Sequence, residues 1–301
     1  MQKNVLIAGG SGLVGKRLSE LLSQKGYSVN WLSRTKNSAA KYPAYEWDLE
    51  KGFIEDEAIQ KADYVINLSG ASIADKPWTA KRKQEIIASR TESIRLLNRY
   101  FKKIKFPEVY CSATAVGYYG NAGNQLVDET TPPGQEGFLP ESCILWEEAF
   151  HEVKEPGLRT VALRLGIVLS DKGGALEKLA MPFKFFMGNW LGSGDQWYSW
   201  IHIDDLCRMF IHALENDNIQ GIYNAVAPNP VTNKALTYTL KKVIGKPAIM
   251  MPVPEFALRI GMGEMADMVL DSAKISSKKI EKTGFDFLYP DLEQALQDLI
   301  T

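Results

Sequence analysis

One stretch near the start of the chain constrains the fold more than any other. A short apolar run, Val5 to Ala8, leads directly into the glycines Gly9, Gly12 and Gly15, and residues 16–24 then read as a helix. Gly9 permits a tight turn, Gly12 lets the backbone approach a pyrophosphate, and Gly15 lets the helix pack close to the strand. The free N–H groups at the start of the helix then face the phosphates. The sequence therefore predicts a βαβ unit that binds a dinucleotide.

The end of the second expected strand, residues 27–32, indicates which dinucleotide is bound. Arg34 stands where proteins that select NAD usually carry an acidic side chain on the ribose 2′-hydroxyl. A guanidinium group there can pair with a 2′-phosphate in a two-pronged geometry, and Ser33 adds a hydroxyl donor. We therefore expect NADP(H). A solvated basic loop is the alternative interpretation of the same residues.

Length, charge and cysteine content exclude several other classes of protein. The chain has 301 residues, 45% of them hydrophobic, and a net charge of −1, so it can bury a sizeable core and lacks the basic surplus typical of nucleic-acid binding. No apolar run reaches the ~18 residues of a membrane span. Widely spaced cysteines and scattered histidines predict neither a disulfide framework nor a metal site. We expect a protein of the reducing cytoplasm that binds neither nucleic acid nor membrane.

Several longer stretches resemble one known family. They are AGGSGLVG from residue 8, NLSGASIADKPWTAKRKQEIIASR from 67, SATAVGYYG from 112, GSGDQWYSWIHIDDL from 192, and the tail from Pro252 to Leu299. Together they resemble the extended, epimerase-like short-chain dehydrogenases/reductases, and within them the atypical YfcH-type group, which ends in a C-terminal domain of unknown function. The resemblance implies an α/β fold, with a Rossmann-like doubly wound parallel sheet and a smaller C-terminal region that caps the substrate.

The expected domain division follows from this resemblance. Residues 1–170 form the NADP-binding domain, to which 200–228 return, and residues 171–199 and 229–301 form the capping region. Aromatic residues crowd the glycine-rich segment 183–200, which suits a cap over a flat ligand, although packing between the two regions would use the same side chains. In the strand–helix unit that follows, Asp204 is expected to cap the helix, and His202 is expected to be structural.

Further cofactor contacts are expected outside the glycine loop. Thr79 can cap a helix through Ile104, and Arg90 falls on the apolar stripe of that helix. A charge there is costly unless paired, so we expect Arg90 to meet a cofactor group or an internal carboxylate. The resemblance places Asp48 beside the adenine, where the alternative is a surface turn, and Glu85 at the cofactor, where the alternative is a solvated helix face. The complete set of expected cofactor contacts is Gly9, Ser11, Gly12, Leu13, Val14, Gly15, Ser33, Arg34, Asp48, Leu68, Ser69, Gly70, Ala71, Glu85, Arg90 and Val168.

The middle of the chain lacks the catalytic pair of the family. In related epimerases a Ser or Thr positions the substrate, a Tyr transfers the proton, and a Lys lowers the pKa of that Tyr. Ser112 and Thr114 supply hydroxyl groups at the end of the strand expected near residues 108–112. The positions that match the Tyr and the Lys are Leu139 and Cys143, and no Tyr or Lys occurs from residue 135 through 151. The usual pair is absent.

Two interpretations of the function remain open. Tyr118 and Tyr119 are the nearby phenols, so either is a candidate proton donor unless both simply pack beside the glycine-rich turn. The chain is then an NADP(H)-dependent oxidoreductase or epimerase with an altered active site, acting on a small polar substrate such as a nucleotide-linked sugar. The alternative is a non-catalytic NADP(H) sensor. A homodimer is compatible with both.

Overall fold

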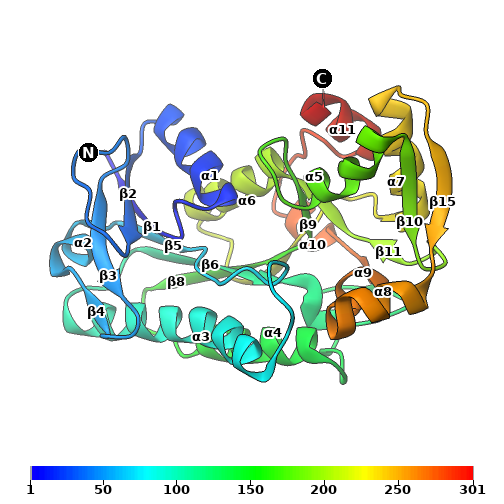
Figure 1. The fold of residues 1–301 in the computed structure, drawn as a ribbon. Helices are drawn as coiled ribbons and strands as arrows, with labels where there is room; N and C mark the ends of the chain where they lie inside the picture. Colours follow the sequence, from blue (N-terminus) through cyan, green and yellow to red (C-terminus); the bar gives the residue numbers. More distant parts are fainter. Residues whose placement is uncertain (1, 301) are drawn as a thin grey trace.

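The computed structural model describes residues 2–300 and is built around one eight-stranded sheet (Figure 1). The strand order is β13-β8-β6-β5-β1-β2-β3-β4, and every pair is parallel except β3 with β4. The strands are β1 (Asn4–Ala8), β2 (Ser28–Ser33), β3 (Ala44–Asp48), β4 (Phe53–Ile54), β5 (Tyr64–Asn67), β6 (Val109–Ala115), β8 (Arg159–Leu165) and β13 (Gly221–Ala225). This is the doubly wound α/β fold that the sequence predicted.

The strand order reverses between β1 and β5. From β1 the chain proceeds outward through β2 and β3, and from β5 it proceeds the other way through β6, β8 and β13. In open α/β sheets, ligands bind in the crevice at the carboxyl ends of the strands where the order reverses. The fold therefore places a ligand crevice beyond Ala8 and Asn67, the last residues of β1 and β5.

Helices cover both faces of the sheet. Figure 1 shows α1 (Leu13–Gln24) and α6 (Ile203–Glu215) above the sheet and α3 (Ala80–Lys103) and α4 (Phe138–His151) below it, with the short α2 (Asp56–Lys61) near the edge. The Thr79 hydroxyl accepts the N–H of Arg82 at 3.2 Å, so Thr79 caps α3 as predicted. None of the helices within residues 2–300 combines the length and the apolar character needed to cross a bilayer.

The cap of α6 differs from the prediction. The Nδ1 atom of His202, not the Asp204 carboxylate, accepts a backbone N–H at the start of α6, at 3.1 Å. The Asp204 carboxylate instead receives two hydrogen bonds from Arg17, at 2.6 and 2.8 Å. The sequence favoured Asp204 because Asp is a common helix cap. In the structure, the guanidinium group of Arg17 on α1 binds the Asp204 carboxylate instead.

The strand expected at residues 160–169 is two strands. β8 ends at Leu165, and β9 (Ile167–Leu169) leaves the main sheet to pair with β12 (Trp200–His202). A Cβ atom on Gly166 would lie 2.5 Å from the carbonyl oxygen of Ser199, so this close crossing of two backbones requires glycine. The break directs the chain from the sheet toward the C-terminal region.

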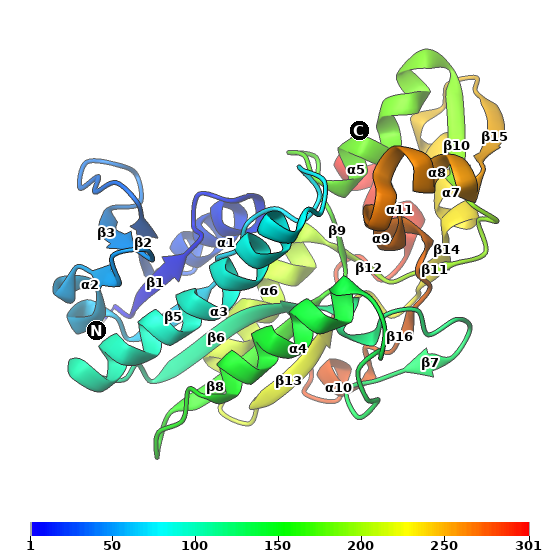
Figure 2. The ribbon, with the colours of Figure 1, turned by 60° about the horizontal axis from the view of Figure 1, so that its bottom comes forward.

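The C-terminal region packs beside the carboxyl edge of the sheet (Figure 2). Its helices are α5 (Ala175–Ala180), α7 (Asn233–Ile244), α8 (Glu255–Met262), α9 (Asp267–Leu270), α10 (Lys278–Glu281) and α11 (Leu292–Ile300). Its strand pairs are β10 (Met187–Leu191) with β15 (Ile249–Val253), β11 (Trp197–Tyr198) with β14 (Val231–Thr232), and β16 (Lys274–Ile275) with β7 (Leu126–Val127). Since β7 follows β6 in the chain, the last pair joins the two regions directly.

Candidate functional site

The glycine loop forms a cradle at the carboxyl end of β1. Gly9 has a φ of 82°, and a Cβ atom there would lie 2.8 Å from the backbone of Leu68. A Cβ atom on Gly15 would lie 2.4 Å from the carbonyl oxygen of Gly9. Gly12 precedes α1, no side chain caps the helix, and a Cβ atom on Gly12 would meet no atom within 4 Å except that same carbonyl oxygen, at 3.3 Å. The N–H groups at the start of α1 are therefore open to a phosphate group, and the loop fits a dinucleotide.

The loop after β2 leaves the Arg34 guanidinium without a protein partner in the described chain. Arg34 is exposed and makes no hydrogen bond or ion pair with any residue between positions 2 and 300. Its neighbour Lys36 is paired with Glu55, and the Ser33 hydroxyl accepts the N–H of Thr35 at 3.4 Å. The charge of Arg34 is thus available to an anionic group at this end of β2.

Asp48 closes a turn. Its carboxylate accepts the backbone N–H groups of Glu50 and Lys51, at 2.9 and 3.1 Å, and these hydrogen bonds together with the Lys51 ammonium group lower its pKa. These contacts match the surface-turn alternative. Glu85, also expected at the cofactor, is exposed and pairs with Arg82 at 3.1 Å.

Arg90 lies against the loop that follows β5. Its guanidinium carbon would be 3.1 Å from a Cβ atom on Gly70, and it donates hydrogen bonds to the carbonyl oxygens of Ala71 and Ile86 at 3.1 and 2.9 Å. The guanidinium group also lies 4.9 Å from the centre of the Trp146 ring. Burial lowers the pKa of Arg90, and no carboxylate among residues 2–300 pairs with it. One alternative from the sequence, an internal carboxylate, is therefore excluded for the described chain, and a ligand group remains the expectation.

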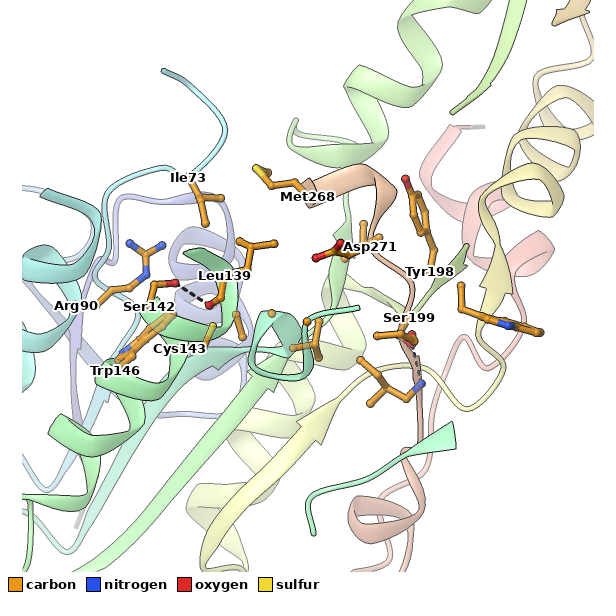
Figure 3. Close-up of a pocket in the computed structure, with 18 residues that line it drawn as sticks. Ile73, Arg90, Leu139, Ser142, Cys143, Trp146, Tyr198, Ser199, Met268 and Asp271 are labelled. Atoms are coloured by element: carbon orange, nitrogen blue, oxygen red, sulfur yellow. Dashed lines mark hydrogen bonds between the residues drawn. The ribbon is translucent and has the colours of Figure 1, made fainter. Parts of the chain in front are cut away.

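A cavity of about 230 Å³ lies between α4, the turn after β6, and the C-terminal region (Figure 3). Its wall is mostly apolar and includes Ile73, Val116, Leu139, Trp146, Ile167 and Met268. Arg90 and Asp271 also line it, from opposite sides in Figure 3. Because Ala115 ends β6 and Val116 and Gly117 follow it directly, the cavity opens at the same sheet edge as the glycine cradle.

The two positions of the missing catalytic pair both face this cavity. Leu139 and Cys143 line it from α4, and a Cβ atom on Gly117 would lie 3.4 Å from the Cys143 sulfur and 3.4 Å from Leu139 Cβ. Burial raises the pKa of the Cys143 thiol to about 12, which keeps it neutral. The helix thus presents an apolar contact where a phenol and an ammonium group would act.

The four candidate catalytic residues lie outside the wall of the cavity. Tyr119 is buried, donates its hydroxyl hydrogen to Asn224 at 2.8 Å, and has a pKa that burial raises to about 12. The guanidinium carbon of Arg164 lies 3.6 Å from the centre of the Tyr118 ring. Ser112 donates to the carbonyl oxygen of Ala113, and the buried Thr114 hydroxyl has no hydrogen-bond partner in the described chain. This geometry favours packing as the role of the two tyrosines.

A buried ion pair links α4, which lines the cavity, to β8. Arg164, on β8, binds both carboxylate oxygens of Glu147, on α4, at 2.7 Å each, and also donates to the Tyr119 hydroxyl at 2.9 Å. Both charged side chains are almost fully buried. Arg164 is the single charge inside the apolar strand VALRLGIVL, a pattern that indicates a buried partner, although the sequence prediction did not include it.

Asp271 was also missed. It follows α9 and places a carboxyl group in the cavity wall, where no residue within 2–300 hydrogen bonds to it. Partial burial, and secondarily the neighbouring Asp267 carboxylate, raise its pKa to about 6. Nothing in the local sequence, VLDSAKISS, distinguishes this carboxyl from a surface Asp, so its role follows only from its place in the fold.

Comparison with known proteins agrees with this architecture. Residues 5–225 match the NAD dependent epimerase/dehydratase family, and residues 253–299 match a domain of unknown function, DUF1731. The chain is 37% identical to Epimerase family protein YfhF of Bacillus subtilis over 299 residues, which cover 99% of this chain and 98% of that protein. It is also 37% identical to Epimerase family protein SSP1921 of Staphylococcus saprophyticus, over 99% of both chains.

Solved structures show the same relationship. The human epimerase family protein SDR39U1, crystallised with NADPH, has a TM-score of 0.88 and 30% identity, with 98% of each chain covered. UDP-glucuronic acid 4-epimerase from Bacillus cereus, in complex with UDP-glucuronic acid and NAD, has a TM-score of 0.79 over 98% of this chain and 96% of that one, but its 18% identity shows the fold alone. This chain therefore belongs to the NAD dependent epimerase/dehydratase family, as an atypical extended short-chain dehydrogenase/reductase with a C-terminal DUF1731 domain.

Proposed function

We propose that this chain is an NADP(H)-dependent oxidoreductase of the epimerase-like type, which interconverts a carbonyl and a hydroxyl group in the cavity between its two regions. The observation that carries the proposal is that Arg90 connects the cradle to the cavity. Gly9 packs against the backbone of Leu68, Gly70 of the same loop lies against the Arg90 guanidinium, and Arg90 lines the cavity. A bound nicotinamide dinucleotide supplies or accepts the hydride.

Residues of the chain would hold each part of this cofactor. The N-terminal N–H groups of α1 bind the pyrophosphate, and the backbone of Leu68 to Ala71 passes the ribose beside the Arg90 guanidinium. Val168, just after the break at Gly166, lies on the strand that leads away from the sheet toward the cavity. The human relative that was crystallised with NADPH supports the choice of NADP(H).

The unpaired Arg34 sets the expected preference between the two dinucleotides. A charge-assisted hydrogen bond to the 2′-phosphate contributes roughly 1.5–3 kcal/mol, which corresponds to ~10- to 100-fold in affinity. Titration by nicotinamide fluorescence should give NADPH a dissociation constant at least about tenfold below that of NADH. Arg34→Ala should remove most of this difference and leave NADH binding nearly unchanged, and the preference should shrink as salt is raised because the contact is exposed.

Lys36→Ala is the matched control. Its ammonium group is already paired with Glu55, so this variant should retain most of the preference. Equal affinities for NADPH and NADH in the wild-type protein would contradict the role proposed for Arg34.

A second candidate function is a non-catalytic NADP(H) sensor, which the apolar Leu139 and Cys143 at the positions of the missing pair favour. A panel of small aldehydes, ketones and nucleotide-linked sugars, with cofactor turnover followed optically, separates the two functions. Sustained turnover contradicts the sensor.

We also propose a reducing cytoplasmic location, which the three free, buried cysteines support.

A further inference from the structure

The hydroxyl groups that line the cavity are already used by the protein. Ser142, Ser199 and Tyr198 each donate a hydrogen bond to a backbone carbonyl oxygen, at 2.9, 2.9 and 2.8 Å. Burial also raises the pKa of Tyr198. None of the three is free to give a proton to a ligand.

Among the remaining polar groups of the cavity, only Asp271 can exchange a proton near neutral pH. A guanidinium group such as that of Arg90 keeps its charge, and burial holds the pKa of the Cys143 thiol at about 12. The carboxyl group of Asp271 has a pKa raised to about 6 by burial and by the nearby Asp267, against which Arg259 acts in the opposite sense. A general acid is most effective when its pKa lies near the working pH.

The backbone at Asp271 is held from both regions. The hydroxyl group of the next residue, Ser272, donates to the carbonyl oxygen of Gly123 at 2.7 Å and accepts the N–H of Trp197 at 3.0 Å. Ala122 donates its N–H to the Ser272 carbonyl oxygen at 2.7 Å. Such support from neighbouring residues is what keeps a functional side chain in a defined geometry.

We propose that Asp271, supplied by the C-terminal domain, is the group that exchanges a proton with the substrate oxygen in this cavity, in place of the absent Tyr and Lys. The inference rests on the proposed function. In the reducing direction the O–H bond of the carboxyl group breaks and an O–H bond forms on the carbonyl oxygen, while the carbonyl carbon gains the hydride. The carbonyl becomes an alcohol, and the carboxylate regains its proton from water. Oxidation of an alcohol is the reverse.

The polar groups of the cavity also define the class of substrate. A sugar ring needs a hydrogen-bonding partner for most of its hydroxyl groups, because a buried polar group without one is costly. This cavity offers apolar side chains such as Ile73, Leu139 and Met268, and its other polar groups are the Asp271 carboxyl, a neutral thiol and the Arg90 guanidinium, which already binds two carbonyl oxygens. We therefore assign a small aldehyde or ketone with an apolar body, whose oxygen meets Asp271.

The first test measures the carboxyl group itself. Protein labelled with ¹³C at the Asp carboxyl carbon is titrated by NMR, and the resonance missing from Asp271→Asn identifies the group. It should titrate near pH 6 without added ligand, and titration near pH 4 would overturn the proposal. Asp195→Asn, which removes an exposed Asp of the same region, should leave that resonance in place.

The second test measures turnover with defined probes, 4-nitrobenzaldehyde and 9,10-phenanthrenequinone, in the presence of NADPH. Loss of a general acid typically costs 10²- to 10⁴-fold in rate, so Asp271→Asn should lose at least ~100-fold. Its dissociation constant for NADPH should stay within about twofold of the wild-type value. In Asp195→Asn, both the turnover rate and the dissociation constant for NADPH should stay within about twofold of wild type. Wild-type turnover of a probe by Asp271→Asn, or NADPH binding with no turnover of either probe by the wild-type protein, overturns the role of Asp271. A protein that does not bind NADPH contradicts the proposed function instead.

Discussion

At the scale of single residues, two charged groups of the cavity lack the partner that a buried charge usually has. Arg90 is satisfied by two carbonyl groups and a Trp ring, with no carboxylate among residues 2–300, and the Asp271 carboxyl has no hydrogen bond from the described chain. Burying such groups costs stability. Perturbed ionisable groups in a cleft are typical of functional sites. We therefore expect each of these two side chains to lower the stability of the folded protein and to contribute to ligand binding.

The stability of the protein should therefore depend on pH through Asp271. Because burial raises the pKa of this carboxyl from 3.8 to about 6, the folded state holds its proton more tightly than the unfolded state. Wild-type stability should then fall as pH rises from about 4 through about 6 and stay lower above. Asp271→Asn cannot ionise and should be more stable at pH 8 by about 1 kcal/mol, a value discounted for partial exposure, or ~2 °C in melting temperature.

Thermal melts at two values of pH check this expectation. The advantage of Asp271→Asn should largely vanish near pH 4, where the wild-type carboxyl is protonated in the folded state and partly protonated in the unfolded state. An advantage of the same size at pH 4 and pH 8 would show that the substitution acts through packing. Asp195→Asn, at an exposed position, is the control and should show neither effect.

Arg90 should affect binding more than folding. Arg90→Leu removes no ion pair, and the two lost hydrogen bonds to carbonyl groups are offset by the removal of a desolvated charge. The melting temperature should change by less than ~2 °C, whereas the dissociation constant for NADPH should rise about tenfold. Gly70→Ala should have a similar effect, since its Cβ atom would lie 3.1 Å from the guanidinium carbon and displace it. An unchanged dissociation constant in both variants would show that Arg90 is purely structural.

At the scale of helices and strands, the pair of Arg164 with Glu147 should be the strongest single link between β8 and α4. Glu147→Gln leaves the Arg164 charge buried without its counterion, which typically costs 3–5 kcal/mol. The exposed pair of Arg95 with Glu152, at 2.9 Å, is the matched control, and Glu152→Gln should cost less than ~1 kcal/mol. Urea unfolding measures both. Similar small losses would mean that the buried pair is no more important than a surface one.

The local sequence pattern predicted the helices and strands well where the structure at a position admits one residue type only. The glycines at 9 and 15 fixed β1 and α1, because no other residue fits those positions. Prediction was wrong where a distant segment intervened. The run from 160 to 169 read as one strand, and its break depends on the backbone of Ser199 crossing Gly166. Asp204 read as a cap, and its carboxylate is bound by Arg17 from another helix.

The same limit applies to the candidate site. The sequence singled out Arg34, Leu139 and Cys143 because each belongs to a motif with a fixed spacing. It singled out Tyr119 because phenols near a catalytic strand are candidates, yet the hydroxyl is bound to Asn224 on a strand distant in sequence. Asp271 belongs to no motif, and its pKa depends on burial that only the assembled tertiary structure provides.

At the scale of the whole molecule, the segment around Ser272 joins the two regions, so we expect a single unfolding transition in calorimetry. Ser272→Ala removes the hydrogen bond to the Gly123 carbonyl oxygen and leaves the Trp197 N–H without its acceptor. The free energy of unfolding should fall by about 1–3 kcal/mol. The NMR titration of Asp271 should also move toward pH 4 as the segment loosens. Ser193→Ala, which removes an exposed contact to Asp195 at 3.2 Å, should leave both unchanged. Two separate transitions in the wild-type protein would contradict this coupling.

The apolar contact of α4 with Gly117 has a consequence for inheritance. With the role proposed for Asp271, the reactive side chain lies not on the helix that lines the cavity but within residues 253–299, and selection on the chemistry would act there. After a gene duplication, one copy could change ligand or lose its reaction through a substitution at position 271 while its nucleotide cradle stayed intact. Surveys of genomes that recognise active members of this family by Tyr-x-x-x-Lys would count both copies as inactive, and the residue that separates them is an aspartate near the end of the chain.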